Sequence, residues 1–553
     1  MCHIYRFLVL ALLFSFPSLM IYGQNCSATA ITNLDINNVD ATMLQGGAFW
    51  WDFNDGAYIV PKDNPDRVSA IFAGGLWFGG FDPGGNLKVK AIAYDASDAG
   101  SPGPMTNGVT DPDLCANFDK HWTVLQASIE AHVADFNDNG QIDNPLNEIM
   151  SWPGRGNSSS IAYNGFELPD VDLAPFFDSN SNGLYEPLSG EYPLIKGDQA
   201  IWWIYNTGED FNPFDSPDIQ ASVLAYSFSS ADETLDLTTF YDVNFKNAGV
   251  ESLDSAFVGL WVDADLGCYA DDYIGCSPGH NLSYVYNADA IDGDPQCIGI
   301  PSYGEEIPVL GIKILKGATD ANGDDLGMSS FIYMSNAAVN NPPAATTDPE
   351  TPIEFYNYLN GHWRDGIPMT FGGDGYSGGL STDETNYVFT DNPSDPNGWS
   401  MCSVAFPFYD RRTLMNSGPF NLQPGQSNQI SFAVITVENQ VHPCPDITPL
   451  LDACEIVKNT FDGLTPAAEQ FLPQSEMQVF PNPFIHEVKI SIKGEIKIQD
   501  LSLFSIDGKL LKEFNGINST EFMLERGAMP KGIYLLKAQL DNGQLAVGKL
   551  VAE

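Results

Sequence analysis

Short apolar runs that end at glycine, proline, asparagine or aspartate recur through most of this 553-residue chain. Short segments bounded by such turn residues are typical of β-strands. Helical periodicity is scarce and predicts only two helices, at residues 122–136 and 447–461. The chain is therefore predicted to be mainly β, with a large β-sandwich-like body and few helices. The clearest predicted strands lie within residues 69–82, 86–95, 199–206, 222–228, 238–247, 255–265 and 429–437.

The distribution of charge divides the chain near residue 477. The whole sequence has 24 basic and 72 acidic residues, and residues 477–553 hold nine of each, so the rest carries the entire formal charge of −48. All ten tryptophans also precede residue 477. A composition step of this kind marks a domain boundary. We expect a secreted body at residues 24–465, of one unit or two subdomains, then a linker at 466–476 and a separate domain at 477–553.

The acidity of the body limits its partners. Residues 1–476 have 15 basic and 63 acidic residues, and such a surface repels the phosphate backbone of nucleic acids. The same charge attracts cations. We therefore expect no nucleic-acid partner.

The first 23 residues have the order of a signal peptide. Arg6 supplies a positive start, an apolar stretch runs from Phe7 to Tyr22, and Gly23 is a small residue suited to cleavage. A buried N-terminal helix is the alternative. No later stretch reaches about 18 uninterrupted apolar residues, so we expect no membrane span after removal of the signal.

Residues 477–553 alternate strand-like runs with turns. Asp507-Gly508 and Asn542-Gly543 are hairpin-type dipeptides, and short strands at this density predict a small Ig-like β-sandwich. The motifs FPNPF, IDGK, KGIYLLK and GKLV, in this order, resemble the C-terminal (type A) sorting domain of type IX secretion cargo proteins. An ordinary terminal Ig-like module is the alternative.

The resemblance of this tail to a sorting domain has consequences for location and partners. It implies that the type IX secretion machinery handles the chain through residues 477–553. It also implies passage to the periplasm and across the outer membrane, so that the protein is secreted or attached to the outer-membrane surface.

The body resembles a recurrent, uncharacterised region with calcium-type loops that is found on large type IX cargo proteins. The resemblance covers most of residues 30–440 and implies an architecture and a location, but no chemistry. The motifs that carry it include GGLWFGG at 74–80, WPGRG at 152–156, YPLIKGDQAIWW at 192–203, FYNYLNGHWRDGIPMTFGGDGY at 355–376 and DRRTLMNSGPF at 410–420.

Two polar segments of the body are nearly the same, DFNDNGQIDNPLNE at 135–148 and DSNSNGLYEPLSGE at 178–191. In both, oxygen-bearing side chains alternate before a glycine, as in loops that wrap a hard cation. The glycine permits the sharp turn that brings the carbonyl of the seventh residue toward the ion. Ca²⁺ takes six to eight such oxygens, whereas Mg²⁺ demands stricter geometry.

These segments are not EF-hands, because Leu146 and Ser189 stand where an EF-hand has its bidentate glutamate. Either a glutamate two residues later supplies the last oxygen, or the site is open. Asx-rich turns without an ion are the alternative. We expect two structural Ca²⁺ sites, formed by Asp135, Asn137, Asn139, Gln141, Asp143 and Glu148, and by Asp178, Asn180, Asn182, Leu184, Glu186 and Glu191.

A third acidic constellation follows the predicted strand at residues 255–265. Asp263, Asp265, Asp271 and Asp272 crowd ten residues of sequence. Like charges that lie so close must be neutralised by a cation or spread in water. We therefore expect either a further metal site or a solvated acidic turn. The segment DANGDD at 320–325 is a weaker candidate.

Eight cysteines follow the predicted signal peptide, and an even number in an exported chain suggests disulfides. We expect a bond from Cys268 to Cys276 or Cys297, or a bond between Cys444 and Cys454. Several free buried thiols are the alternative.

Catalytic motifs are not apparent, since the sequence has no HExxH and no phosphate loop of the GxxxxGK[ST] type. His362 is the best lone candidate, and a structural role suits it better. Several tryptophans lie among glycine and aspartate, as in sugar-binding surfaces, although most tryptophans are core residues. We expect a calcium-stabilised protein for adhesion, glycan binding or a structural role. The alternative is a polymer-degrading, glycosidase-like hydrolase whose catalytic carboxylates the sequence does not identify.

Overall fold

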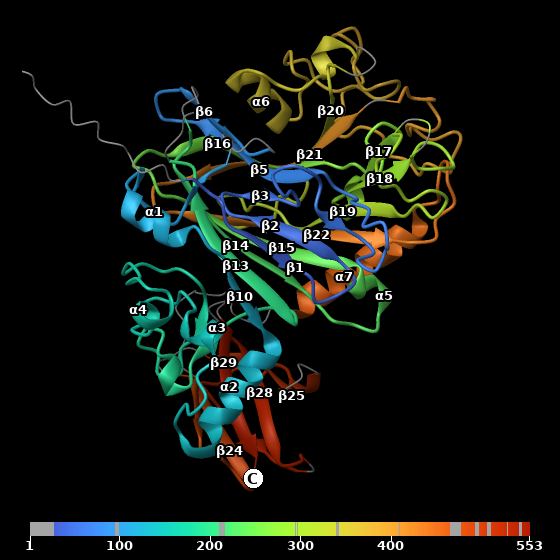
Figure 1. Cartoon of the computed structure of the whole chain (residues 1–553). Helices are drawn as coiled ribbons and strands as arrows, with labels where there is room; N and C mark the ends of the chain where they lie inside the picture. The colour runs from blue at the N-terminus through green and yellow to red at the C-terminus, as the bar shows by residue number, and fades with distance from the viewer. Residues whose placement is uncertain are drawn as a thin grey trace, which may run out of the picture. The chain divides into compact units, whose positions relative to one another are not determined.

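The computed structural model describes residues 27–552 apart from residues 94–98, 209–215, 294, 296, 339–341, 409, 465–476, 493–496, 506–509, 528 and 541–544. The chain divides into two compact units, Met1–Cys454 and Glu455–Glu553 (Figure 1). The predicted signal peptide and linker lie outside the described residues. Within the described part of the chain, no helix is long and apolar enough to cross a membrane.

The first sheet of the body has nine strands in the order β1-β2-β3-β5-β16-β21-β20, with β4 beside β2 and β6 beside β5. Its strand pairs are antiparallel. The strands are β1 (Ile31–Leu34), β2 (Asp40–Leu44), β3 (Ala48–Phe49), β4 (Tyr58–Ile59), β5 (Ala73–Phe81), β6 (Leu87–Ala91), β16 (Leu253–Asp263), β20 (Ser330–Ser335) and β21 (Arg411–Leu422).

The second sheet also has nine antiparallel strands, in the order β10-β13-β14-β15-β22-β19-β18-β17, with β7 beside β13. β13 and β15 have the bounds that the sequence predicted. The strands are β7 (Ser101–Pro102), β10 (Trp122–Leu125), β13 (Gln199–Asn206), β14 (Ile219–Ser227), β15 (Thr238–Asn247), β17 (Asp272–Ser277), β18 (Leu282–Asn287), β19 (Val309–Lys316) and β22 (Ser427–Val437).

Aromatic side chains fill the core between the two sheets. The ring of Phe49 on β3 lies 5.7 Å from that of Tyr241 on β15 and 5.9 Å from that of Phe432 on β22. Trp50 Nε1 donates a hydrogen bond to Tyr241 Oη at 2.8 Å. Figure 1 shows β2, β3 and β5 lying across β14, β15 and β22. The predicted β-sandwich-like body is thus confirmed, and aromatic rings from both sheets meet in its core.

Helices are short and lie in the connections. The first predicted helix is wrong at its start, because residues 122–125 form β10, where Trp122 and Val124 are buried against β13. The second predicted helix, at residues 447–461, corresponds to α7. The helices are α1 (Pro112–Phe118), α2 (Gln126–Asn139), α3 (Asn147–Met150), α4 (Ser160–Tyr163), α5 (Glu233–Asp236), α6 (Pro352–Leu359) and α7 (Thr448–Leu464), with 3₁₀ turns η1 (Pro187–Ser189), η2 (Pro278–His280) and η3 (Ala344–Thr346). Two short strand pairs join β8 (Met105–Thr106) to β9 (Val109–Thr110) and β11 (Phe176–Phe177) to β12 (Tyr192–Pro193).

The tail is a small sandwich with its own core. One sheet has the order β23-β24-β27 and the other β26-β25-β28-β29. Val488, Ile490, Leu501 and Leu536 are buried between them. Both predicted hairpin dipeptides lie outside the described residues, and the strands on either side of each pair as expected for hairpins. The strands are β23 (Met477–Phe480), β24 (Glu487–Ile492), β25 (Ile498–Ser505), β26 (Leu510–Phe514), β27 (Glu521–Glu525), β28 (Gly532–Leu540) and β29 (Leu545–Ala552).

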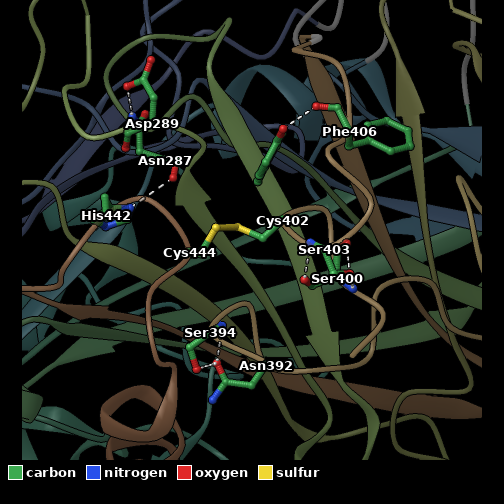
Figure 2. The surroundings of a disulfide bond; sticks show 11 residues. Asn287, Asp289, Asn392, Ser394, Ser400, Cys402, Ser403, Phe406, His442 and Cys444 are labelled. Atoms are coloured by element: carbon green, nitrogen blue, oxygen red, sulfur yellow. Dashed lines mark hydrogen bonds between the residues drawn. A yellow bond between two sulfur atoms is a disulfide. The ribbon is translucent and has the colours of Figure 1, made fainter. Parts of the chain in front are cut away.

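Two disulfides between described residues link distant parts of the body. Cys268 bonds to Cys297, which is one of the expected pairings. The expected bond between Cys444 and Cys454 is wrong, because Cys444 bonds to Cys402 in a loop 42 residues earlier. Figure 2 shows this bond with His442, whose Nδ1 lies 3.2 Å from the carbonyl oxygen of Asn287 at the end of β18. The contact of His442 thus holds the segment after β22 close to β18 of the second sheet, and the disulfide ties the same segment to the loop of Cys402.

Candidate cation sites

The second polar repeat forms the loop of the hairpin between β11 and β12. The amide groups of Asn180 and Asn182 both donate to Glu186 Oε2 at 2.8 Å. Gly183 N donates to Asp178 Oδ2 at 2.7 Å, and the glycine has φ 76°, a conformation that L side chains adopt with strain. Four of the residues predicted as ligands therefore lie close together within one turn.

Glu191, the last residue of this repeat, stabilises the loop through hydrogen bonds from its side chain. Its side chain is fully buried. Its Oε1 accepts hydrogen bonds from Ser179 N at 2.9 Å and Ser179 Oγ at 3.0 Å, and its Oε2 accepts one from Glu186 N at 2.8 Å. Both oxygens are thus engaged with the loop itself. The predicted seventh ligand, Leu184, follows Gly183, and its own N–H donates to Asn182 Oδ1 at 2.7 Å.

The first repeat folds differently, although its sequence is nearly the same. Residues 135 to 139 form the last turn of α2, with Gly140 as the left-handed residue that ends it. In a helix, Asp135 and Asn139 share a face and Asn137 lies on another. Asp135 Oδ2 accepts from Asn144 N at 2.8 Å, and this bond is the main cause that lowers the pKa of Asp135.

The other predicted ligands of the first repeat lie nearby without forming a closed ring. Asn139 Nδ2 donates to Asp143 Oδ2 at 2.7 Å, and Gln141 N donates to Asn139 Oδ1 at 2.8 Å. Glu148 is half-buried on α3 and accepts a hydrogen bond from Ser128 Oγ at 2.7 Å. The matching glutamate of the second repeat instead bonds its own loop, so the two repeats are not equivalent.

The two repeats are packed against each other. His132 on α2 is buried, and its Nε2 lies 3.1 Å from the backbone oxygen of Glu191. A side chain at Gly190 would meet the ring of Phe136, with the nearest atom at 2.4 Å. Residues 126–193 therefore behave as one small module on the edge of the second sheet.

The acidic constellation after β16 separates into two clusters. In the first cluster, carboxylate oxygens of Asp263, Asp265 and Asp410 lie within 4.8 Å of one another. Arg412 on β21 contacts it, with Nε 3.2 Å from Asp263 Oδ2 and Nη1 3.0 Å from Asp410 Oδ1. Burial raises the pKa of Asp263 and that of Asp265, and the guanidinium acts in the opposite direction. This arginine supplies a positive charge from within the chain.

The second cluster is formed by Asp271, Asp272 and Asp292, and we name it the Asp271 cluster. A carboxylate oxygen of Asp271, one of Asp292 and the sulfur of Cys268 lie within 4.8 Å of one another. The sulfur belongs to a disulfide and is therefore not a thiolate ligand. Burial raises the pKa of Asp271 to about 7 and that of Asp292 to about 6, and raises the pKa of Asp272 well above its ordinary value.

Sequence reasoning found four of these aspartates and missed two. Asp410 reaches the first cluster because β21 pairs with β16. Asp292 reaches the second because the Cys268–Cys297 disulfide holds its segment beside the turn after β16. The expected cysteine pairing was the one available signal for Asp292, since it placed residues near 297 beside residues near 268.

The tryptophans considered for a sugar-binding surface are core residues. Trp50, Trp77, Trp202, Trp203 and Trp363 are at most 2% exposed, and Trp51 is 9% exposed. His362 Nδ1 lies 2.9 Å from the backbone oxygen of Asn360, in the turn that follows α6. This contact makes His362 part of the turn itself.

Solved structures resemble the chain only weakly. A polysaccharide lyase matches at 10% identity and a TM-score of 0.18, over 66% of this chain and 37% of that one. A dimeric latent PorU from Porphyromonas gingivalis matches at 8% identity and a TM-score of 0.12, over 67% of this chain and 35% of that one. The chain thus spans little more than a third of either structure, and likenesses at such scores carry no argument. No curated protein matches it.

Residues 478–553 match the family described as the secretion system C-terminal sorting domain. The match covers the small sandwich of β23–β29 and includes the four motifs that first suggested it. The tail therefore marks the protein for export, with release or attachment at the cell surface as the outcome. The match does not extend into the body. By its tail, the chain is a type IX secretion cargo protein.

Proposed function

We propose that the exported body is a calcium-stabilised binding protein that acts outside the cell. The observation that carries the calcium part is the convergence of Asp178, Asn180, Asn182 and Glu186 in the β11–β12 loop. Oxygen donors alone suit a hard cation, and a loop of flexible geometry suits Ca²⁺ better than Mg²⁺. Rotation of the two amide groups would turn their oxygens toward the same point.

The role of the ion is structural. Without it, Asp178 and Glu186 lie close together with no cation between them. An ion that binds only the folded state stabilises it by about 2.7 kcal/mol when its concentration is 100-fold above the dissociation constant. The first repeat has the same donors in sequence, but three of them are in α2, so the proposal rests on the second.

Calorimetry and thermal melting of the exported protein test this part. Ca²⁺ should raise the melting temperature of chelator-treated protein more than Mg²⁺ does, and Asp178→Ala should remove most of that gain. Asp52→Ala is the matched control, because Asp52 accepts backbone bonds from Asn54 and Asp55 in an exposed turn. An unchanged Ca²⁺ response in Asp178→Ala would contradict the loop as the site.

The binding part of the proposal rests on an exposed glycine-rich loop between α6 and β21. Phe371 is 60% exposed and Leu380 is 93% exposed. The ring of Phe371 lies 4.6 Å from that of the buried Trp399. On the same loop, Tyr376 Oη donates to Asp365 Oδ2 at 2.7 Å. An apolar ring with a polar rim is how many glycan-binding surfaces are built.

Incubation with a panel of polysaccharides and proteins separates binding from catalysis. Retention without product supports the binding role, and Phe371→Ala should weaken retention. Val250→Ala, which removes another exposed apolar side chain, is the control. Release of shortened polymer would instead support the hydrolase alternative.

A further inference from the structure

The Asp271 cluster is buried far more deeply than the β11–β12 loop. Asp271, Asp272 and Asp292 are 0%, 4% and 1% exposed. They come from two segments, the turn that leads into β17 and the segment after β18. The Cys268–Cys297 disulfide joins these segments covalently. Oxygens of Asp271 and Asp292 lie within 4.8 Å of each other, and burial together with the charges of both raises the pKa of the neighbouring Asp272.

Among the described residues, the guanidinium of Arg411 approaches the Asp271 cluster at the backbone, where its Nη1 donates to the carbonyl oxygen of Asp272 at 2.9 Å. None of the three aspartate side chains forms an ion pair with a lysine, arginine or histidine of the described part of the chain, in contrast to Asp263 and its partner Arg412. Asp271 Oδ1 and Asp272 Oδ1 are buried and have no hydrogen-bond partner among the described residues. Buried carboxylates without compensation are costly, so the cluster requires a source of positive charge.

Backbone groups fix the carboxylates in place. Leu266 N donates to Asp272 Oδ2 at 2.9 Å, and Cys268 N donates to Asp292 Oδ1 at 2.9 Å. These bonds engage one oxygen of Asp272, and its other oxygen is buried without a hydrogen-bond partner among the described residues. A side chain at Gly267 would lie 2.1 Å from Asp292 Oδ2, so the close approach of this carboxylate requires glycine. The cluster is thus organised before any ligand arrives.

We propose that the Asp271 cluster binds one divalent hard cation of the Ca²⁺ class, through the carboxylates of Asp271, Asp272 and Asp292. The available donors are oxygens, because the nearby sulfur is in a disulfide, and oxygen donors favour Ca²⁺ or Mg²⁺ over softer metals. The site is separate from the β11–β12 loop, so it does not depend on the function proposed above. The ion neutralises the negative charge of the Asp271 cluster. In the first cluster, Arg412 has this role for Asp263 and Asp410.

The test counts Ca²⁺ ions bound to the full chain after chelation, by calorimetry and by metal analysis. Asp271→Asn and Asp272→Asn should each lose one Ca²⁺ per chain, or weaken its binding at least about tenfold. Both variants should melt no lower than the parent when chelator is present, because each removes one of three mutually repelling charges. Asp410→Asn, the control in the cluster that Arg412 contacts, should keep the same number of ions.

The outcomes distinguish this site from the loop. Asp178→Asn should lose a different ion and leave this one in place. If Asp271→Asn and Asp272→Asn bind as many Ca²⁺ ions as the parent with unchanged affinity, the proposal is overturned, whatever Asp178→Asn does. The same holds if the two variants become more stable with no change in Ca²⁺ binding, because the cluster would then be neutralised by protons.

Discussion

Replacement of Glu191 tests how the second repeat is held together. The buried carboxylate accepts three hydrogen bonds from the loop. Hydrogen bonds to a charged group contribute about 1.5–3 kcal/mol each, and an unsatisfied buried donor costs about 1–3 kcal/mol. In Glu191→Gln, one oxygen still accepts from Ser179, while an NH₂ group faces the N–H of Glu186. We expect a loss of about 2–4 kcal/mol in the free energy of unfolding.

Glu148→Gln is the matched control, because the two glutamates occupy the same position of the repeat. Glu148 accepts one hydrogen bond in the structure, from Ser128 Oγ, and is half-buried. Its replacement should cost about 0.5–1 kcal/mol. Denaturant unfolding in the presence of chelator measures both values without a contribution from bound ion.

Two results would refute this reasoning. Equal losses in the two variants would mean that the sequence repeat, and not the different hydrogen bonding, sets the role of the glutamate. A gain of stability in Glu191→Gln would mean that repulsion between Glu191 and its acidic neighbours outweighs the three hydrogen bonds.

Three further predictions concern the tail, an acid-sensitive histidine and the thiols. A chain that ends at Leu464 should melt like the full-length body by calorimetry but should not reach the cell surface, since the tail has a core of its own; normal surface delivery would contradict this. Burial lowers the pKa of His121 to about 4, so as pH falls from 6.5 to 4 the unfolded state takes up the proton first and stability falls by about 3 kcal/mol. His121→Phe should remove that part of the acid sensitivity in denaturant titrations, and an identical pH profile would refute it. Under denaturing but non-reducing conditions, alkylation and peptide mapping should label Cys276 and Cys454 and should leave Cys268, Cys297, Cys402 and Cys444 unlabelled, because only the last four form the two disulfides described; label on Cys268 or Cys402 would show that the bond is absent.

The fold was largely predictable because its strands are bounded by strong turn residues. β13 and β15 have the bounds that the sequence indicated. The helix predicted to begin at residue 122 was wrong at its start because helical periodicity does not reveal that its first four residues pair with Trp202 and its neighbours. β27 was missed because only one of its five residues is buried, which leaves little apolar pattern to read.

The candidate sites were predictable only where their ligands are close in sequence. The β11–β12 loop was found because all of its donors lie within one repeat. The difference between the repeats was not predictable, because it depends on α2 continuing through residues 135–139. Asp292 and Asp410 were missed because a disulfide and a strand pairing bring them to the acidic turn from 20 or more residues away.

The position of β21 and β22 has a consequence for biogenesis. Each lies inside its sheet, between strands that are made earlier, so that Leu414 pairs with Trp261 and Phe432 pairs with Tyr241. The first sheet cannot close until residue 422 has left the ribosome, and the second cannot close until residue 437 has done so. Pairings this distant in sequence form slowly. The body therefore completes its folding only when little besides the sorting domain remains to be synthesised. A chain truncated before that point has neither complete sheets nor the C-terminal sorting domain. The order of the elements therefore keeps incomplete products away from the cell surface.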